Sequence, residues 1–177
     1  MTPPNVLVAA IYLNSRGFGF VVLEGPNLPR DWSVIEARGG DKRERIEHRV
    51  GSLINRYRPD IVVLQNTSRT GTHRSHHIRR LNVVIARRVG QYGVPIEFIS
   101  RDEVRQQFGS LGATTKDAIA AVIARQIPAI ERLLPLPRKP WKSEDAKMGI
   151  FDAAALALTF YNKRSQSGSE SQNDHRV

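Results

Sequence analysis

The feature that most constrains the fold is a nearly continuous apolar run early in the chain, Val-Leu-Val-Ala-Ala-Ile-Tyr-Leu, between Asn5 and Leu13. A strand without alternating polar residues is buried on both faces, so it needs packing layers above and below it. Polar residues at 14–17 supply a turn, and the segments 18–24 and 32–36 are typical of two further strands. Three strands are therefore predicted before any helix.

Helices and strands are then predicted to alternate. Asp41, with Glu44 three residues later, indicates the start of a helix that ends near Arg58-Pro59. A short β-branched run at 61–64 follows as a second interior strand, parallel to the first because a helix separates the two. The remaining pattern predicts a strand at 94–99 and helices at 78–92, 100–108, 114–127 and 143–161, the last opened by Ser143 as its cap.

This order predicts an α/β domain built on a mixed five-stranded sheet, three antiparallel strands followed by parallel strands, flanked by helices. A ligand site is expected at the carboxyl ends of the two central strands, at Leu13-Asn14 and Leu64-Gln65. The domain is predicted to span residues 1–162. Residues 163–177 contain almost no apolar side chains and are predicted to form a disordered tail.

The charge balance favours an anionic partner, with nucleic acid first. The chain carries 27 Lys and Arg against 17 Asp and Glu, a formal net charge of +10. The absence of cysteine excludes disulfides, thiolate zinc sites and a cysteine nucleophile. No apolar stretch is long enough to cross a bilayer, and Met1-Thr2-Pro3-Pro4 lacks the basic start of a signal peptide, so we expect a soluble, cytoplasmic protein without a membrane partner.

Three segments together carry a resemblance to a known family. They are Ile-Tyr-Leu-Asn-Ser-Arg-Gly-Phe-Gly-Phe at 11–20, Asp-Ile-Val-Val-Leu-Gln-Asn-Thr at 60–67 and Ile-Phe-Asp-Ala-Ala-Ala-Leu-Ala-Leu at 150–158. In this order and on these elements, the sequence resembles RuvC-like Holliday-junction resolvases of the ribonuclease H superfamily. The resemblance implies a ribonuclease H-like fold, branched DNA as the partner and a two-fold symmetric homodimer.

In that family, carboxylates from the first strand, the fourth strand and the last helix hold two divalent cations that activate water for phosphodiester hydrolysis. The resemblance places these positions on Tyr12, Gln65 and Asp152, with Glu144 and Asp145 one to two turns before the last of them. Tyr12 is a neutral phenol at pH 7, and an amide offers Mg²⁺ a single uncharged oxygen. We therefore expect a degenerate catalytic site in which Asp152 is the remaining metal ligand and Mg²⁺ or Mn²⁺ binds weakly or not at all.

Each surviving carboxylate also has a structural interpretation. Asp152 is expected to point toward the sheet, where a pair with Arg16 or a polar network is favoured over metal ligation, because an unpaired buried charge is costly. For Asp145, a charge in the first turn of the last helix is favoured over a share in the metal site. Loss of the carboxylates in nature is favoured over an engineered knockout.

Between Ile61 and Ile96 there is no acidic residue, which is the sharpest charge asymmetry in the chain. The arginines in this stretch are Arg69, Arg74, Arg79, Arg80, Arg87 and Arg88. The first four overhang the expected site and are predicted to contact phosphates, whereas the last two suit a solvated helix face. The neighbouring histidines, at 73, 76 and 77, have no carboxylate or thiol nearby and are not expected to bind zinc.

Two smaller basic groups complete the predicted nucleic-acid surface. Lys116 opens one helix, and Lys139 and Lys142 flank Trp141 before the last one. Trp141 could stack on a base, although a packing anchor for the proline-rich linker is the favoured interpretation.

Three functions remain open. The first is a RuvC-like protein that binds branched or structured DNA with weak or absent nuclease activity. The second is an active Mg²⁺-dependent endonuclease of the Holliday-junction resolvase type, using a reduced site. The third is a scaffold that retains the fold for protein contacts.

Overall fold

The computed structural model describes residues 5–68 and 75–173, with side chains as far as residue 168. Five strands and five α-helices are assigned in these residues. In chain order the elements are β1 (Leu7–Asn14), β2 (Gly17–Glu24), β3 (Pro29–Glu36), α1 (Lys42–Tyr57), β4 (Ile61–Gln65), α2 (His76–Gln91), β5 (Ile96–Ile99), α3 (Arg101–Gly109), α4 (Lys116–Gln126), the 3-10 helix η1 (Pro128–Leu133) and α5 (Met148–Asn173).

The sheet has the predicted mixed architecture. Its strand order is β3-β2-β1-β4-β5, with β1, β2 and β3 antiparallel and β4 and β5 parallel to β1. In the central strand β1, residues 8–11 and Leu13 are buried and the other three are half-buried, in keeping with its apolar run. Tyr12 lies opposite Gly19 of β2, and Ile11 lies opposite Leu64 of β4. The prediction of an α/β domain on a mixed five-stranded sheet is confirmed.

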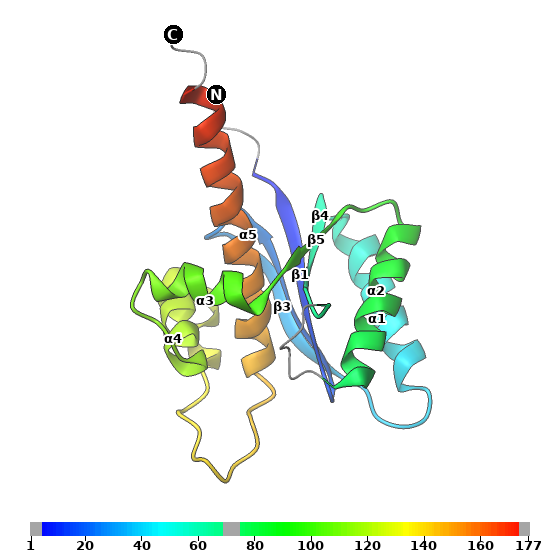
Figure 1. The fold of residues 1–177 in the computed structure, drawn as a ribbon. Helices are drawn as coiled ribbons and strands as arrows, with labels where there is room; N and C mark the ends of the chain where they lie inside the picture. The colour runs from blue at the N-terminus through cyan, green and yellow to red at the C-terminus, as the bar shows by residue number, and fades with distance from the viewer. Residues whose placement is uncertain (1–4, 69–74, 174–177) are drawn as a thin grey trace.

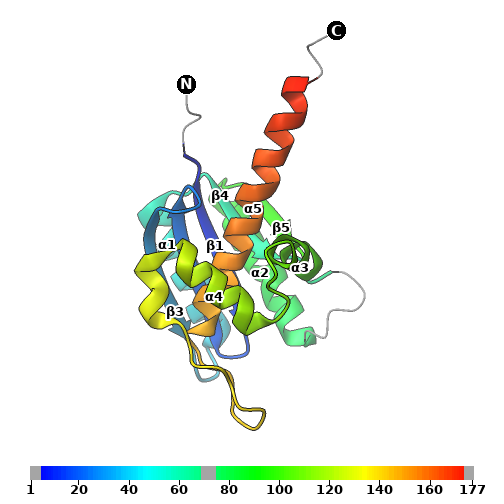
Figure 2. The same ribbon diagram turned by 90° about the vertical axis from the view of Figure 1, so that its left-hand side faces the viewer.

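Helices cover both faces of the sheet. One core forms between the sheet and α1 with α2, centred on Ile11, Ile46 and Ile85. The other forms between the sheet and α3, α4 and α5, and contains Phe108, Ile123 and Phe151. Figure 1 shows these two layers on opposite sides of the strands, and Figure 2 faces the layer in which α5 crosses the sheet.

The start of α5 approaches the sheet so closely that only glycine fits at the contact. A Cβ placed on Gly19 of β2 would lie 2.2 Å from the backbone of Gly149. This contact involves backbone on both sides, so no side-chain rotation can relieve it. The lack of a side chain at Gly19 therefore allows α5 to lie this close to the strands, whereas a Cβ on Gly149 would meet Gly19 at an ordinary contact distance of 3.4 Å.

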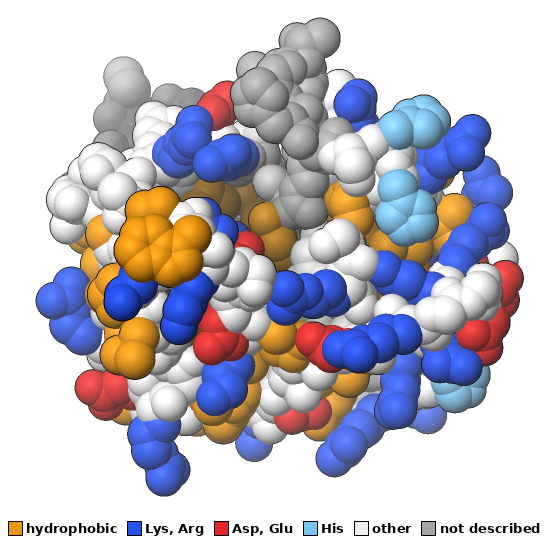
Figure 3. All heavy atoms as spheres, turned by 90° about the horizontal axis from the view of Figure 1, so that it is seen from below, with side chains coloured by type: hydrophobic (Ala, Val, Ile, Leu, Met, Phe, Trp, Pro, Cys, Tyr) orange, Lys and Arg blue, Asp and Glu red, His pale blue; other side chains and the backbone are white. Residues whose placement is uncertain are grey.

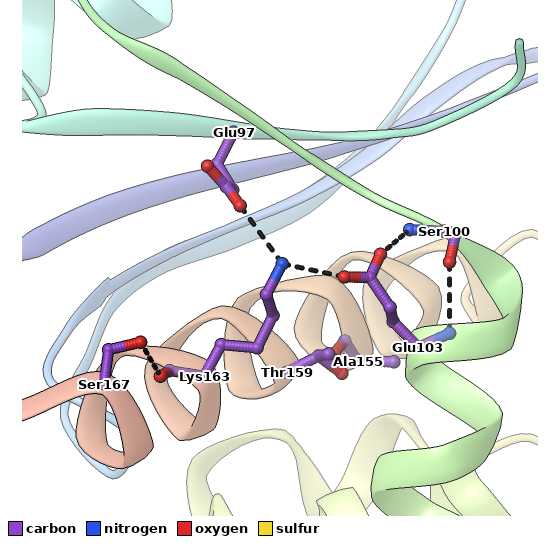
Figure 4. Close-up of polar contacts among 7 residues, drawn as sticks. All are labelled: Glu97, Ser100, Glu103, Ala155, Thr159, Lys163 and Ser167. Carbon is purple, nitrogen blue, oxygen red and sulfur yellow. Dashed lines mark hydrogen bonds and ion pairs between the residues drawn. The ribbon is translucent and has the colours of Figure 1, made fainter. Parts of the chain in front are cut away.

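The boundaries of α5 differ from the prediction at both ends. The helix begins at Met148 rather than Ser143. It continues to Asn173, so residues 163–173, predicted to be disordered, are helical. Lys163 explains part of this extension, because its ammonium lies 3.2 Å from Glu97 of β5 and 2.7 Å from Glu103 of α3 (Figure 4). Glu103 also accepts a hydrogen bond from the backbone N–H of Ser100 and thereby completes a capping box.

The same contacts determine the charge states of this group. Hydrogen bonding to Glu103 raises the pKa of Lys163 against the opposing effect of burial. For Glu103, burial acts to raise the pKa, but the hydrogen bonds from Lys163 and Ser100 lower it overall.

None of the helices in the described residues is long and apolar enough to pass through a membrane.

Candidate functional site

Three of the predicted site residues meet at one end of the sheet. Tyr12 lies near the end of β1, Gln65 is the last residue of β4, and Asp152 lies in the second turn of α5. All three line one hollow of about 400 Å³. They converge because β1 and β4 run parallel, which brings their carboxyl ends to the same edge, and because the contact between Gly19 and Gly149 holds α5 beside that edge.

A lysine from α4 lies among these residues. The Thr115 hydroxyl oxygen accepts a hydrogen bond from the backbone N–H of Ala118 at 3.2 Å. This cap begins the helix at Lys116, two residues later than the predicted start at 114. The Lys116 ammonium lies 3.0 Å from the Asp152 carboxylate and also pairs with Glu144. It is 5.7 Å from the centre of the Tyr12 ring. The sequence favoured a pair with Arg16 or a polar network for Asp152, and the structure pairs Asp152 with Lys116, which the sequence did not suggest as its partner.

The surroundings of Lys116 favour its charged form. Burial acts to lower the pKa of Lys116. This effect is outweighed by the charge of Asp152, by the proximity of Tyr12 and by the hydrogen bonds to Glu144 and Asp152, so the pKa is raised above its usual value. The Asp152 side chain is only 14% exposed, whereas the Lys116 and Glu144 side chains are 42% and 44% exposed. The ion pair is therefore enclosed on the Asp152 side and open to solvent on the Glu144 side.

Glu144 and Asp145 lie in the turns that precede α5. The Asp145 carboxylate accepts a hydrogen bond from the backbone N–H of Lys147 at 2.8 Å, and the Arg16 guanidinium donates to the backbone oxygen of Glu144 at 3.4 Å. Asp145 also lines a second hollow with Asn14 and Asp152. Because α5 begins at Met148, the prediction that Asp145 lies in the first turn of a helix capped by Ser143 is wrong.

These residues do not fit a pair of divalent cations. In the part of the chain that the structure describes, no three histidine or acidic side chains are grouped so that they could hold a metal ion. Asp152, Glu144 and Asp145 line the hollow at the end of β1, and Lys116 already compensates part of the charge of the first two. Hard cations need anionic oxygen ligands, which the Tyr12 phenol and the Gln65 amide do not supply. A metal ion beside Asp152 would have to compete with the ammonium of Lys116.

Basic side chains surround this end of the molecule. Figure 3 looks onto it and shows Lys and Arg side chains spread across the face, with a few acidic groups between them. Arg79 and Arg80 are exposed near the start of α2, whose cap Ser75 lines the second hollow with Arg16. Arg69 and Arg74, the other predicted phosphate contacts, and His73 lie outside the described residues.

The segment 134–147 projects from the body at the same end of the molecule, as Figures 1 and 2 both show. Trp141 in this segment is 77% exposed, so it does not pack as the anchor that the sequence favoured. The Lys139 ammonium lies 5.6 Å from the centre of its ring. Lys139 and Lys142 line a third hollow together with Lys116, so the projecting segment and the site form a continuous surface.

Two arginines that the sequence analysis did not select also belong to this site. Arg101 and Arg105 of α3 line the same hollow as Gln65 and Asp152. The one sequence feature that could have identified them is their spacing, because residues four apart on a predicted helix lie on the same face. Their relation to the site could not be recognised because α3 reaches it only through the tertiary packing of α3 against α5.

The sequence matches no protein-family model and no curated protein, whereas the structure is similar to solved structures. RuvC of Thermus thermophilus in complex with a Holliday junction substrate superposes with a TM-score of 0.67 at 19% identity, over 91% of this chain and 96% of that one. Another structure of Thermus thermophilus RuvC gives a TM-score of 0.64 at 22% identity, over 90% and 96%. The yeast mitochondrial Holliday junction resolvase Ydc2 gives 0.60 at 14% identity, over 92% and 82%.

Proposed function

We propose that the protein, which has a RuvC-like, ribonuclease H-like fold, binds branched or structured DNA across the end of the sheet where β1 and β4 terminate. In this proposal the site retains DNA without supporting two-metal cleavage. The protein acts as a recognition module, and Mg²⁺ and Mn²⁺ are not required for binding.

The observation that carries the proposal is the position of Lys116. Its ammonium pairs with Asp152 and Glu144, two of the three acidic side chains that line the hollow at the end of β1. Tyr12 and Gln65 are uncharged where the resemblance expects carboxylates. The Lys116 ammonium therefore supplies positive charge where divalent ions would otherwise lie. It carries only one charge, and unlike a metal ion it cannot coordinate and activate a water molecule.

Charge and shape support DNA as the partner. The formal net charge is +10, and the face around the site carries Arg16, Lys116, Lys139 and Lys142 beside its hollows. Lysine and arginine bind the phosphate backbone without reading sequence, which suits a substrate recognised by its branching. One of the similar structures, RuvC of Thermus thermophilus, is described in complex with a Holliday junction substrate.

Binding and cleavage assays on one set of substrates test the proposal. The full chain is titrated against a four-way DNA junction, a duplex and a single strand of equal length, at several salt concentrations in EDTA. We expect the junction to bind most tightly. Its affinity should fall steeply as the salt concentration rises, and the slope of log affinity against log salt concentration should be roughly −0.9 for each phosphate contact. The mass of the complex shows whether it contains one copy of the chain or two.

The same junction is then incubated with Mn²⁺ and either the natural chain or the Tyr12→Asp/Gln65→Glu variant. We expect no cleavage by the natural chain. Metal-dependent cleavage by the natural chain would overturn the proposal in favour of an active endonuclease. Equal and weak binding to all three substrates at low salt would overturn it in favour of a protein scaffold.

A further inference from the structure

Gln65 has an unusual environment for a buried amide. The residue is only 9% exposed, and its side chain lines the hollow of about 400 Å³. Its backbone oxygen is fixed by a hydrogen bond from the Asn82 side chain at 2.9 Å. Within the described residues, the Gln65 side-chain amide has no hydrogen-bond partner. Among the described residues only Arg88 Nε is a fully buried side-chain atom without a partner, so the Gln65 amide is not sealed in the core but borders the hollow. Its donors and acceptor are therefore available to whatever enters the hollow.

The walls of the hollow suit a flat apolar group. Val104, Ile119 and Phe151 line it from α3, α4 and α5. Tyr12 and Gln65 add a phenol and an amide from the sheet. Ligand sites commonly combine apolar walls with a few polar groups that fix the orientation of the ligand. An amide both donates and accepts hydrogen bonds, and it therefore matches the edge of a nucleobase, which presents both kinds of group.

Cationic groups line the same hollow. Arg101 and Arg105 are exposed on α3 and one helical turn apart, and Lys116 lies beside Asp152. Arginine binds phosphate through parallel N–H groups, so these side chains suit the backbone of a strand whose base lies inside. Lys116 also lines the adjoining hollow that contains Lys139 and Lys142, so a strand on the basic face can reach the opening.

We propose that this hollow receives a single unpaired base from a bound DNA strand, with Gln65 and Tyr12 at its edge and Arg101 and Arg105 at its phosphates. The inference rests on the proposed function, since the strand must first bind to the basic face. Unpairing costs least where the duplex is already interrupted. The base therefore comes from the branch point of a junction. The hollow recognises the branch by binding the base that is unpaired there.

The experiment places 2-aminopurine, a fluorescent base, at each position next to the crossover of a four-way junction and titrates it with the full chain. We expect its emission to change at least twofold at one position as the base unstacks, while the same label in a duplex changes little. Fluorescence anisotropy of a distant dye reports binding in the same samples. Loss of binding by anisotropy would overturn the proposed function as well, whereas binding with constant 2-aminopurine emission at every position would overturn only this inference.

Two variants connect the signal to the hollow. Gln65→Met keeps the size of the side chain but removes its hydrogen bonds, and it should abolish most of the emission change while lowering junction affinity less than about tenfold. Gln126→Met, an exposed glutamine at the end of α4, is the matched control and should retain the signal.

Arg101→Gln/Arg105→Gln changes only exposed positions and should also reduce the signal. An unchanged signal in both the Gln65 and the arginine variants would overturn the inference, as would binding of free AMP or GMP as tight as that of the junction.

Discussion

The Lys116 ammonium lies 3.0 Å from the Asp152 carboxylate, and this ion pair joins the start of α4 to the second turn of α5. Asp152 is mostly enclosed, so its charge has little access to water. The lysine lowers the cost of that enclosed charge. The same pair keeps α4 and α5 together at the end of the sheet where the hollows open.

A double-mutant cycle measures this ion pair. Lys116→Met leaves Asp152 next to Glu144 without its cation, and it should lower the free energy of unfolding by roughly 2 kcal/mol, less than for a fully buried pair because the lysine is partly exposed. Asp152→Asn in the Lys116→Met background should cost much less than in the natural chain. Urea unfolding of the four proteins gives the coupling, and Lys147→Met, at an exposed lysine, is the control. Additive effects would contradict the prediction.

Restoring metal binding should require the removal of Lys116 as well as the addition of carboxylates. In the Tyr12→Asp/Gln65→Glu variant, the ammonium still competes with a divalent ion for Asp152. Adding Lys116→Ala removes this competition, and we expect Mn²⁺ to bind the triple variant at least roughly tenfold more tightly, equivalent to about 1.4 kcal/mol. Calorimetric titration with Mn²⁺ measures both variants. Equal affinities would show that Lys116 does not compete for the site.

The sheet and the meeting of Tyr12, Gln65 and Asp152 could be predicted because they depend on local patterns and on the rule that parallel strands end at one edge. The role of Lys116 could not, since α4 reaches the site only through tertiary packing. The start of α5 was misplaced for a local reason. Asp145 accepts a hydrogen bond from the Lys147 backbone, and this turn competes with the helix that Ser143 was expected to open.

The helical extension at the carboxyl end illustrates the same limit. Residues 163–173 have no apolar pattern, so composition predicted disorder. Lys163 nevertheless contacts Glu97 and Glu103, which come from two elements more than fifty residues earlier in the chain (Figure 4). Contacts between residues so far apart leave no signal in a single sequence.

A side chain at position 19 should displace the site helix. In Gly19→Ala the added Cβ would lie 2.2 Å from the Gly149 backbone, so α5 must move away from β2. We expect a loss of about 3 kcal/mol in the free energy of unfolding, at the upper end for an overpacked contact. The control is Gly40→Ala, where nothing lies within 4 Å of the added atom. Similar unfolding midpoints for the two variants would contradict the close approach.

Trp141 should contribute to DNA affinity by stacking. Its ring is 77% exposed on the projecting segment, beside Lys139. Trp141→Ala should weaken junction binding by about 1–3 kcal/mol without changing stability, because stacking on a base is lost and no packing is. Trp141→Phe should retain part of the affinity. Unchanged affinity in the alanine variant, or a marked loss of stability, would contradict this role.

The hydroxyl of Tyr161 should make the stability of the fold sensitive to alkaline pH. It accepts a hydrogen bond from the Gly25 backbone at 3.0 Å, and it lies 2.7 Å from the Val6 oxygen and 2.8 Å from the Leu23 oxygen, to either of which it can donate. Burial is the main cause that raises the pKa of Tyr161 to about 12, from an ordinary value of 10.0.

Because the folded protein holds this proton more tightly than the unfolded chain, the resulting stabilisation is complete below pH 10 and is lost as the pH rises toward 12. Two pKa units correspond to about 3 kcal/mol. Tyr161→Phe removes the titrating group and should be less stable by roughly 1–2 kcal/mol at pH 8, since the groups around the hydroxyl lose a partner. Because the pH-linked loss exceeds this advantage, urea unfolding from pH 8 to pH 12 should show the advantage of the natural chain shrinking and then reversing near pH 12. A constant difference between them across this range would contradict the assignment, because it would mean that Tyr161 does not titrate differently in the folded and unfolded states.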